Sequence, residues 1–326
     1  MRTKIYLWLL TAWLVFGSGR LPAQQVMLYQ QSPVDMYVIN PAFAGYDENI
    51  HLNLCYLKQY AGITKSPQSH YFNVYSRLGK RPAKVYKQYS LRISQPGKYS
   101  TVGKPKASKI IHGTGAFISN DAYGQMKKLN TGLSYSLHYR LNEKNTAAIG
   151  LSAGLVNFSF NKDGLIPDIP LDETLQQFIN QNYSTSFINL NGGILLYSSK
   201  WMISYSAHQI LGNQIWLRSE SNPYQIQLHH FLSAQYKMSI KQGELKLNPG
   251  LIVRYLKGID PLVELNTLLY TDRYWGGIAY RLNNSALLMF GIKWNKINVG
   301  YSYSLNTNFL FNNTAGSHEL LLGMTF

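Results

Sequence analysis

Apolar and polar residues alternate with a period of two along much of the chain, most clearly between Ile297 and Phe326. Successive side chains of a β-strand point to opposite faces, so this spacing predicts strands with one apolar and one polar face. This stretch contains two alternating segments. The apolar face of the first segment carries Ile297, Val299, Tyr301, Tyr303 and Leu305. The last segment places His318, Leu320, Leu322, Met324 and Phe326 on one face, opposite Glu319, Leu321, Gly323 and Thr325.

The same alternation recurs upstream, for example from Leu129 to Leu141, and the candidate strands number about fourteen. Along residues 147–160 the apolar parity switches near Val156, which predicts a β-bulge there. We predict the other strands at residues 51–60, 68–77, 109–117, 185–197, 201–208, 226–240, 244–256, 262–270, 274–282 and 286–294.

Two all-β folds alternate in this way, a soluble sandwich and an outer-membrane barrel. The surface of a sandwich would carry Lys, Glu and Thr, whereas the polar parity here is crowded with Gly, Ser and Asn. The apolar parity is rich in Tyr and Leu, as in lipid-facing strands with aromatic girdles. The pattern therefore favours an all-β fold, a transmembrane outer-membrane β-barrel of about 14 antiparallel strands.

The lengths of the predicted links support the barrel. Short links at 142–144, 198–200, 241–243 and 271–273 alternate with long ones at 161–184, 209–225 and 306–315. Outer-membrane barrels have short periplasmic turns and long extracellular loops. We therefore expect both chain ends on the periplasmic side.

The start of the chain is typical of a secretory signal. Arg2 and Lys4 precede an apolar run that is too short for a comfortable transmembrane helix, and small residues lead to Ala23. We expect residues 1–23 to be a signal peptide, 24–48 a periplasmic extended segment, and 49–326 the barrel. No later window approaches the roughly 18 consecutive apolar residues that a membrane helix needs.

The formal net charge is +16, and its excess is concentrated in a basic insertion at residues 77–109. That stretch contains ten Lys or Arg and no Asp or Glu. In a secreted protein such a charge favours binding to anionic lipid, to glycan or to an acidic partner over binding to nucleic acid. Two interpretations remain open, a solvated loop without a partner and a periplasmic docking arm that uses Lys80, Arg81, Lys84 and Lys87.

Candidate catalytic and metal-binding residues are sparse, and we expect neither an enzyme nor a cofactor. The single cysteine, Cys55, excludes an internal disulfide, and the adjacent His229 and His230 point to opposite faces of a strand. A hydrolase could use Ser136 and His138, although both are better explained as polar groups of the lumen. Other residues expected in the lumen are Lys246, Arg254 and Glu264. The Gly113-Thr-Gly115 sequence lacks the third glycine and the following helix of a nucleotide-binding loop.

Two segments near the start of the chain resemble a known family. Tyr29-Gln-Gln-Ser-Pro33 and Ile39-Asn-Pro-Ala-Phe-Ala-Gly45 are similar to the amino terminus of PorP/SprF proteins of type IX secretion and gliding in Bacteroidetes, with Phe43 in place of Tyr. Tyr56-Leu-Lys-Gln-Tyr60-Ala-Gly62 resembles the family's first strand and loop. The terminal strands resemble it at Tyr274–Arg281, Asn298–Tyr303 and Gly316–Leu320.

The resemblance implies a non-catalytic component of the outer membrane that anchors secretion machinery or a secreted adhesin. The partners it implies are type IX secretion components, a periplasmic peptidoglycan-associated lipoprotein and secreted cargo. The alternative is a porin or transporter for small solutes, because a barrel of this size can enclose a pathway. Because the last strand closes a barrel, we also expect Phe326, Met324 and Leu322 to matter for assembly.

Overall fold

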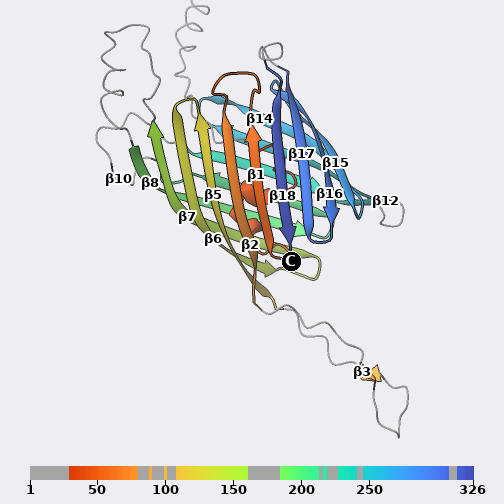
Figure 1. The fold of residues 1–326 in the computed structure, drawn as a ribbon. Helices are drawn as coiled ribbons and strands as arrows, with labels where there is room; N and C mark the ends of the chain where they lie inside the picture. The colour runs from red at the N-terminus through yellow and green to blue at the C-terminus, as the bar shows by residue number, and fades with distance from the viewer. Residues whose placement is uncertain are drawn as a thin grey trace, which may run out of the picture.

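The computed structural model describes residues 29–79, 88–89, 99–100, 108–160, 184–212, 216–218, 227–240, 245–307 and 314–326. Within these residues, fourteen antiparallel strands form one closed barrel (Figure 1). They are β1 (His51–Lys58), β2 (Gln68–Leu78), β5 (Ile110–Tyr123), β6 (Met126–Arg140), β7 (Asn145–Phe160), β8 (Ser184–Ser198), β9 (Trp201–His208), β11 (His229–Tyr236), β13 (Leu245–Leu256), β14 (Ile259–Tyr270), β15 (Tyr274–Arg281), β16 (Ser285–Trp294), β17 (Ile297–Asn306) and β18 (Ser317–Thr325). The predicted fold class is confirmed.

The strands follow one another around the barrel in chain order, so each is paired with its sequence neighbours. The first and last strands meet, with Leu54 of β1 opposite Leu322 of β18. Two short strands extend the sheet, β10 (Trp216–Arg218) beside β8 and β12 (Met238–Ile240) beside β13. A separate pair is formed by β3 (Gln88–Tyr89) and β4 (Tyr99–Ser100).

The barrel carries its apolar residues outside and its polar residues inside. The side chains of Leu133 and Ile278 are 71% and 61% exposed, whereas those of Ser136 and Ser302 are fully buried. Such an apolar outer face is suited to lipid, and barrel closure leaves no unpaired strand edge within it. The described residues contain no helix that is both long and apolar enough to cross a membrane.

Strand β7 differs from the prediction of a bulge near Val156. Its pairing with β6 and with β8 runs without a register shift. Val156 and Phe158 are buried on the inner face, as is Phe187 of β8. The apolar parity therefore switches because this part of the inner wall is apolar, and the backbone stays regular.

The two rims of the barrel differ in their links, as predicted. The carboxyl-terminal end of β18 lies at the rim with the short links 199–200, 271–273 and 295–296 (Figure 1). The long links 161–183, 209–228 and 307–316 all connect strands at the opposite rim, which also has the short links 124–125, 257–258 and 282–284. We call these the periplasmic rim and the outer rim, after the usual arrangement of outer-membrane barrels. The link from β2 to β5 leaves from the periplasmic rim, but Lys80, Arg81, Lys84 and Lys87 lie outside the described residues.

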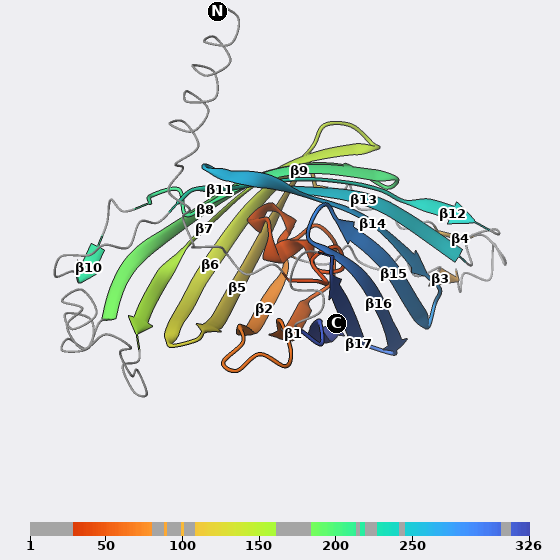
Figure 2. The same ribbon diagram turned by 90° about the horizontal axis from the view of Figure 1, so that it is seen from above.

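Residues 29–46, which we call the plug, lie inside the barrel (Figure 2). The plug contains two short 3-10 helices, η1 (Met36–Val38) and η2 (Pro41–Phe43), and nearly all its residues are buried. This differs from the expected extended segment in the periplasm. The polar inner wall explains the difference, because it offers hydrogen bonds that an isolated peptide would otherwise make with water.

Candidate functional site: the plugged lumen

The Asn40-Pro41-Ala42 sequence builds the centre of the plug. Asn40 caps η2, because its side-chain oxygen accepts a hydrogen bond from the Ala42 amide at 2.8 Å. Pro41 occupies the first helical position, where a missing N–H costs little. The Asn40 amide nitrogen donates to two wall carbonyls, Ile194 O at 3.1 Å and Tyr205 O at 3.2 Å. One side chain therefore shapes the plug and joins it to both β8 and β9.

Glycines of the inner wall make room for the plug. A Cβ added at Gly193 would lie 2.0 Å from Asn40 Oδ1, and one at Gly150 would lie 2.3 Å from the Ala42 amide nitrogen. A Cβ at Gly113 would lie 2.1 Å from the Ala44 carbonyl oxygen, and one at Gly115 would lie 2.5 Å from the Tyr37 hydroxyl. The Gly113-Thr-Gly115 sequence thus lets the plug backbone at Ala44 and the Tyr37 side chain pack closely against the wall.

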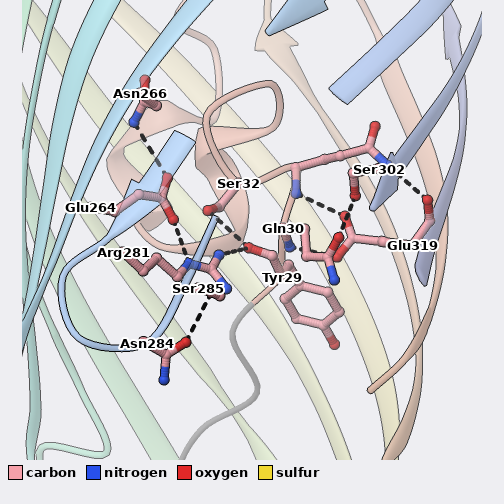
Figure 3. Close-up of polar contacts among 11 residues, drawn as sticks. Tyr29, Gln30, Ser32, Glu264, Asn266, Arg281, Asn284, Ser285, Ser302 and Glu319 are labelled. Carbon is pink, nitrogen blue, oxygen red and sulfur yellow. Dashed lines mark hydrogen bonds and ion pairs between the residues drawn. The ribbon is translucent and has the colours of Figure 1, made fainter. Parts of the chain in front are cut away.

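The outer end of the plug is bound by Glu319 of β18 (Figure 3). The carboxylate of Glu319 accepts hydrogen bonds from the backbone amides of Gln30 at 2.5 Å and Gln31 at 2.8 Å. The hydroxyl of Ser302 donates to the Gln30 side-chain oxygen at 2.7 Å. Glu319 is only 1% exposed, so these charge-assisted bonds replace the water that a carboxylate would otherwise require.

A buried ion pair binds the plug backbone one residue earlier. Arg281 Nε donates to Glu264 Oε2 at 2.7 Å, and its Nη2 donates to the Tyr29 carbonyl at 3.1 Å (Figure 3). Strand order alone would pair Glu264 of β14 with Arg254 on the preceding strand, β13. Register explains why Arg281 is the partner, because it lies directly opposite Glu264 on β15, whereas Arg254 lies opposite Leu262.

Two asparagines hold the middle of the plug. The amides of Asn53 and Asn73, on β1 and β2, both donate to Asp35 Oδ2, at 3.0 Å and 2.5 Å. Beside them the Tyr37 ring stacks on Tyr75 with 4.6 Å between centroids, and its hydroxyl bonds Ser134 Oγ at 2.6 Å. Wall and plug are therefore joined on the β1, β2 and β6 side as well as at β8 and β9.

Ser136 and His138, the pair considered for hydrolysis, bind the plug. The Ser136 hydroxyl donates to the Ala44 carbonyl, and His138 Nε2 lies 2.6 Å from the same oxygen. Ser206 and His208 of β9 bind the Ile39 carbonyl in the same way. These side chains thus satisfy carbonyls of the plug that would otherwise be unpaired in the lumen.

The chain leaves the plug at the periplasmic rim through a charged turn. His51 Nε2 lies 2.8 Å from Asp47 Oδ1, and Arg77 Nη1 lies 3.2 Å from Glu48 Oε1. Burial acts to raise the pKa of Asp47, but the hydrogen bond and charge of His51 outweigh it, so the pKa lies below its usual value. The carboxylate therefore stays ionised and fixes the connection between plug and β1.

The plug separates two cavities. The outer cavity lies above it and is lined by Tyr29, Ser32, Tyr37, Val38, Ile39, Pro41, Tyr71, Phe117, Ser119, Asp121, Lys128, Asn130, Ser152, Asn189, Asn191, His208, Gln209, Phe231, Ile252, Arg254, Leu262 and Glu264. The periplasmic cavity is lined from the other side by plug residues that include Pro33, Asp35, Phe43 and Tyr46. Tyr37 lines both cavities, so it lies in the layer that divides the lumen.

The remaining predicted lumen residues fall as their parity indicates. His229 is buried inside, and His230 faces outward, where its Nδ1 lies 2.7 Å from the Tyr205 hydroxyl. Arg254 is buried on the inner face, and Lys246 lines a small cavity with Tyr270 and Lys293. The part of the chain that the structure describes contains no group of three His, Cys, Asp or Glu residues that could hold a metal ion.

Comparison with known proteins identifies the family. A family model described as type IX secretion system membrane protein PorP/SprF matches residues 21–324. The chain belongs to this family. The suspected resemblance is thereby confirmed, and with it a place among type IX secretion membrane proteins. The barrel fold and the family together point to the outer membrane. No curated protein matches the chain.

Solved structures share the barrel fold at low sequence identity. The CymD monoaromatic hydrocarbon channel aligns with a TM-score of 0.50 and 10% identity, covering 91% of this chain and 92% of its own. The toluene transporter TodX of Pseudomonas putida gives 0.47 and 9%, covering 93% and 94%. A FadL homologue of Pseudomonas aeruginosa gives 0.44 and 10%, covering 88% and 91%. At such identity the likeness concerns the fold alone.

The plug contacts were missed by the sequence analysis, although one signal was available. An Asn before Pro is typical of a turn, but it can equally cap a short helix, as Asn40 does for η2. Nothing in a single sequence pairs Glu319 with the amides of Gln30 and Gln31, because these residues stand nearly the whole chain apart.

Proposed function

We propose that this protein is a non-catalytic component of the outer membrane in type IX secretion or gliding. It anchors secretion machinery or a secreted surface adhesin through a periplasmic lipoprotein partner. The observation that carries this proposal is the plugged lumen in a chain of the PorP/SprF family. A barrel filled by its own amino-terminal segment is suited to holding partners at its rims.

The charge of the periplasmic rim supports a partner with an acidic face. Basic side chains at the described part of this rim are Lys109, Arg140, Lys144, Lys200, Lys237, Arg273, Lys293 and Lys296. The described acidic residues there are Asp47 and Glu48, which are already bonded to His51 and Arg77, together with Glu143 and Asp272. An acidic surface would therefore meet an excess of positive charge, and its binding would weaken with salt.

The basic insertion extends the same argument as a docking arm. Replacing Lys80, Arg81, Lys84 and Lys87 with Gln should release the lipoprotein partner from the tagged protein while barrel levels in the membrane stay normal. A matched control replaces four cations at or near the outer rim: Lys58, Lys65, Lys127 and Lys257. Unchanged copurification with the first variant, or cutting of residues 77–109 by protease added to intact cells, would contradict the docking arm.

A channel for small solutes is the second candidate. The cavities above and below the plug, and the CymD-like fold, favour it. Conductance of the purified barrel in lipid bilayers separates the two candidates. A durable open channel would support the solute channel, and a closed barrel that copurifies with secretion components would support the anchor.

A further inference from the structure

The periplasmic cavity is the larger of the two cavities that the plug separates. Its volume is about 420 Å³, against about 80 Å³ for the outer cavity. The plug forms its floor with apolar and aromatic side chains, namely those of Pro33, Val34, Met36, Phe43 and Tyr46. A cavity of this volume is within the usual range of binding pockets, so it has room for a large side chain.

The mouth of this cavity lies at the periplasmic rim and is positively charged. Its lining includes Asn295 and Lys296, which form the turn between β16 and β17 at that rim, and Lys293 near the end of β16. Lys293 also lines the smaller cavity with Lys246 of β13, and these two lysines are near enough to repel each other. All three lysines are exposed, and none forms an ion pair within the described residues. Their charges are therefore available to a ligand that enters from the periplasm.

Two carboxylates line the cavity, and both are bonded to other groups. Asp35 on the floor accepts hydrogen bonds from the side-chain amides of Asn53 and Asn73, at 3.0 Å and 2.5 Å. Asp47 near the rim lies 2.8 Å from His51 Nε2. Neither carboxylate forms an ion pair with a lysine of the mouth. The lining of the cavity therefore does not neutralise the lysines by direct contact.

Two further negative groups lie near the mouth, and both must be counted. Asp272 lines the smaller cavity, and the carboxylate of Phe326 belongs to a residue whose ring centroid is 4.8 Å from Lys296 Nζ. Cations there are more numerous, and one of them, Lys237, donates to the Tyr46 hydroxyl of the floor at 2.5 Å. The described cations around the mouth are Lys237, Lys246, Arg273, Lys293 and Lys296. Positive charge is thus in excess, and it attracts an acidic ligand.

We propose that the periplasmic cavity is a docking site for an acidic peptide segment of a periplasmic partner. The segment inserts one aromatic or large apolar side chain against the floor of the cavity, and its flanking carboxylates meet Lys293 and Lys296. The inference rests on the proposed function, and it adds where the lipoprotein partner binds and which chemistry recognises it. An anchor in a pocket, surrounded by complementary charges, gives an interface both affinity and specificity.

Three synthetic peptides test the proposal against the intact barrel in an uncharged detergent, with binding measured by fluorescence anisotropy. The Phe peptide is dye-labelled Asp-Glu-Phe-Glu-Asp with both ends blocked. The second peptide has Gly in place of Phe, and the third has Asn and Gln in place of Asp and Glu. We expect the Phe peptide to bind at least ten-fold more tightly than either of the others. Raising the ionic strength to about 1 M, where the Debye length is about 3 Å, should weaken it.

Variants of the barrel locate the site. Replacing both Lys293 and Lys296 with Gln should weaken the Phe peptide at least ten-fold, whereas the same change at Lys58 and Lys127, at the outer rim, should have no effect. Thr325→Trp fills part of the cavity that Thr325 lines and keeps every charge. It should weaken the Phe peptide and leave the Gly peptide unchanged. A change of gel migration on heating verifies that each variant is folded.

The outcomes separate this inference from the proposed function. The docking site is overturned if the Phe peptide binds no more tightly than either comparison peptide, or if the lysine and Trp variants both bind it unchanged. A lipoprotein that still copurifies from native membranes would then leave the proposed function standing, because the basic insertion could hold it. Selective binding of the Phe peptide, with no lipoprotein in the purified material, would support the site and contradict the proposed function.

Discussion

Replacing Gly193 with Ala should unseat the plug while the barrel stays closed. The new Cβ would lie 2.0 Å from Asn40 Oδ1 and 2.7 Å from its Cγ, so the Asn40 side chain must move. That side chain makes three hydrogen bonds, with the Ala42 amide and with the carbonyls of Ile194 and Tyr205. Moving it breaks the cap of η2 and both bonds to the wall.

The expected effect follows from these three bonds. At about 1 kcal/mol each, their loss amounts to about 3 kcal/mol. That free energy corresponds to a shift of roughly 100-fold between seated and displaced plug. Gly192 provides the control, because a Cβ there meets its nearest atoms, the side chains of Ile210 and Leu151, at 3.4 Å. Both substitutions also lower the entropy of the unfolded chain similarly, so this effect cancels in the comparison.

The assay is single-channel recording in planar bilayers, combined with limited proteolysis of residues 29–46. Gly193→Ala should raise the open fraction and the rate of plug cleavage, whereas Gly192→Ala should match the unmodified protein. Indistinguishable records from the two variants would refute the close packing of Asn40 against β8.

Three further outcomes are expected. The protein should be embedded in the membrane, and its migration in gel electrophoresis should change on heating. Recovery of the protein in the soluble periplasmic fraction without detergent would contradict the closed barrel. Phe326 forms two backbone hydrogen bonds with Ile50, both of 3.0 Å, so its deletion should lower the amount of barrel in the membrane. Replacing the neighbouring outward side chains Met324 and Leu322 with Ala should also lower it. Immunoblotting of membrane fractions measures both effects. Glu319→Gln should weaken the binding of the outer end of the plug by about 1.5–3 kcal/mol. The oxygen of the Gln side chain accepts a hydrogen bond without a charge, and the NH₂ group of that side chain cannot accept one at all. Proteolysis of the plug at the rate of the unmodified protein would exclude this role of Glu319.

The barrel was predictable from sequence because its rule is local. A period of two assigns each residue of β17 and β18 to a face of the sheet without knowledge of any partner strand. The lengths of the links between strands indicate which rim of the barrel each link occupies. The rule held even where its apolar and polar classes were mixed: Leu321 and Glu319 share the inner face of β18 although their chemistry is opposite.

The plug was not predictable in the same way because its contacts have no period. Ser136 and His138 were predicted only as polar groups of the lumen, and Ser206 and His208 were not singled out. Only the fold brings these side chains to the carbonyls of Ala44 and Ile39. Arg281 was not singled out at all, since the choice between it and Arg254 as partner of Glu264 depends on strand register.

The way the plug is bound determines how it could move. Most of its connections to the wall are hydrogen bonds, and each contributes only about 0.5–1.5 kcal/mol net because water replaces it when the plug leaves. The barrel itself depends on backbone pairing within lipid, where no water is available, so those bonds are far more costly to break. A partner that offers the plug equivalent hydrogen bonds could therefore displace it without opening the wall. Glu319 is the point at which such a partner would compete most directly, because its carboxylate holds two backbone amides of the first turn.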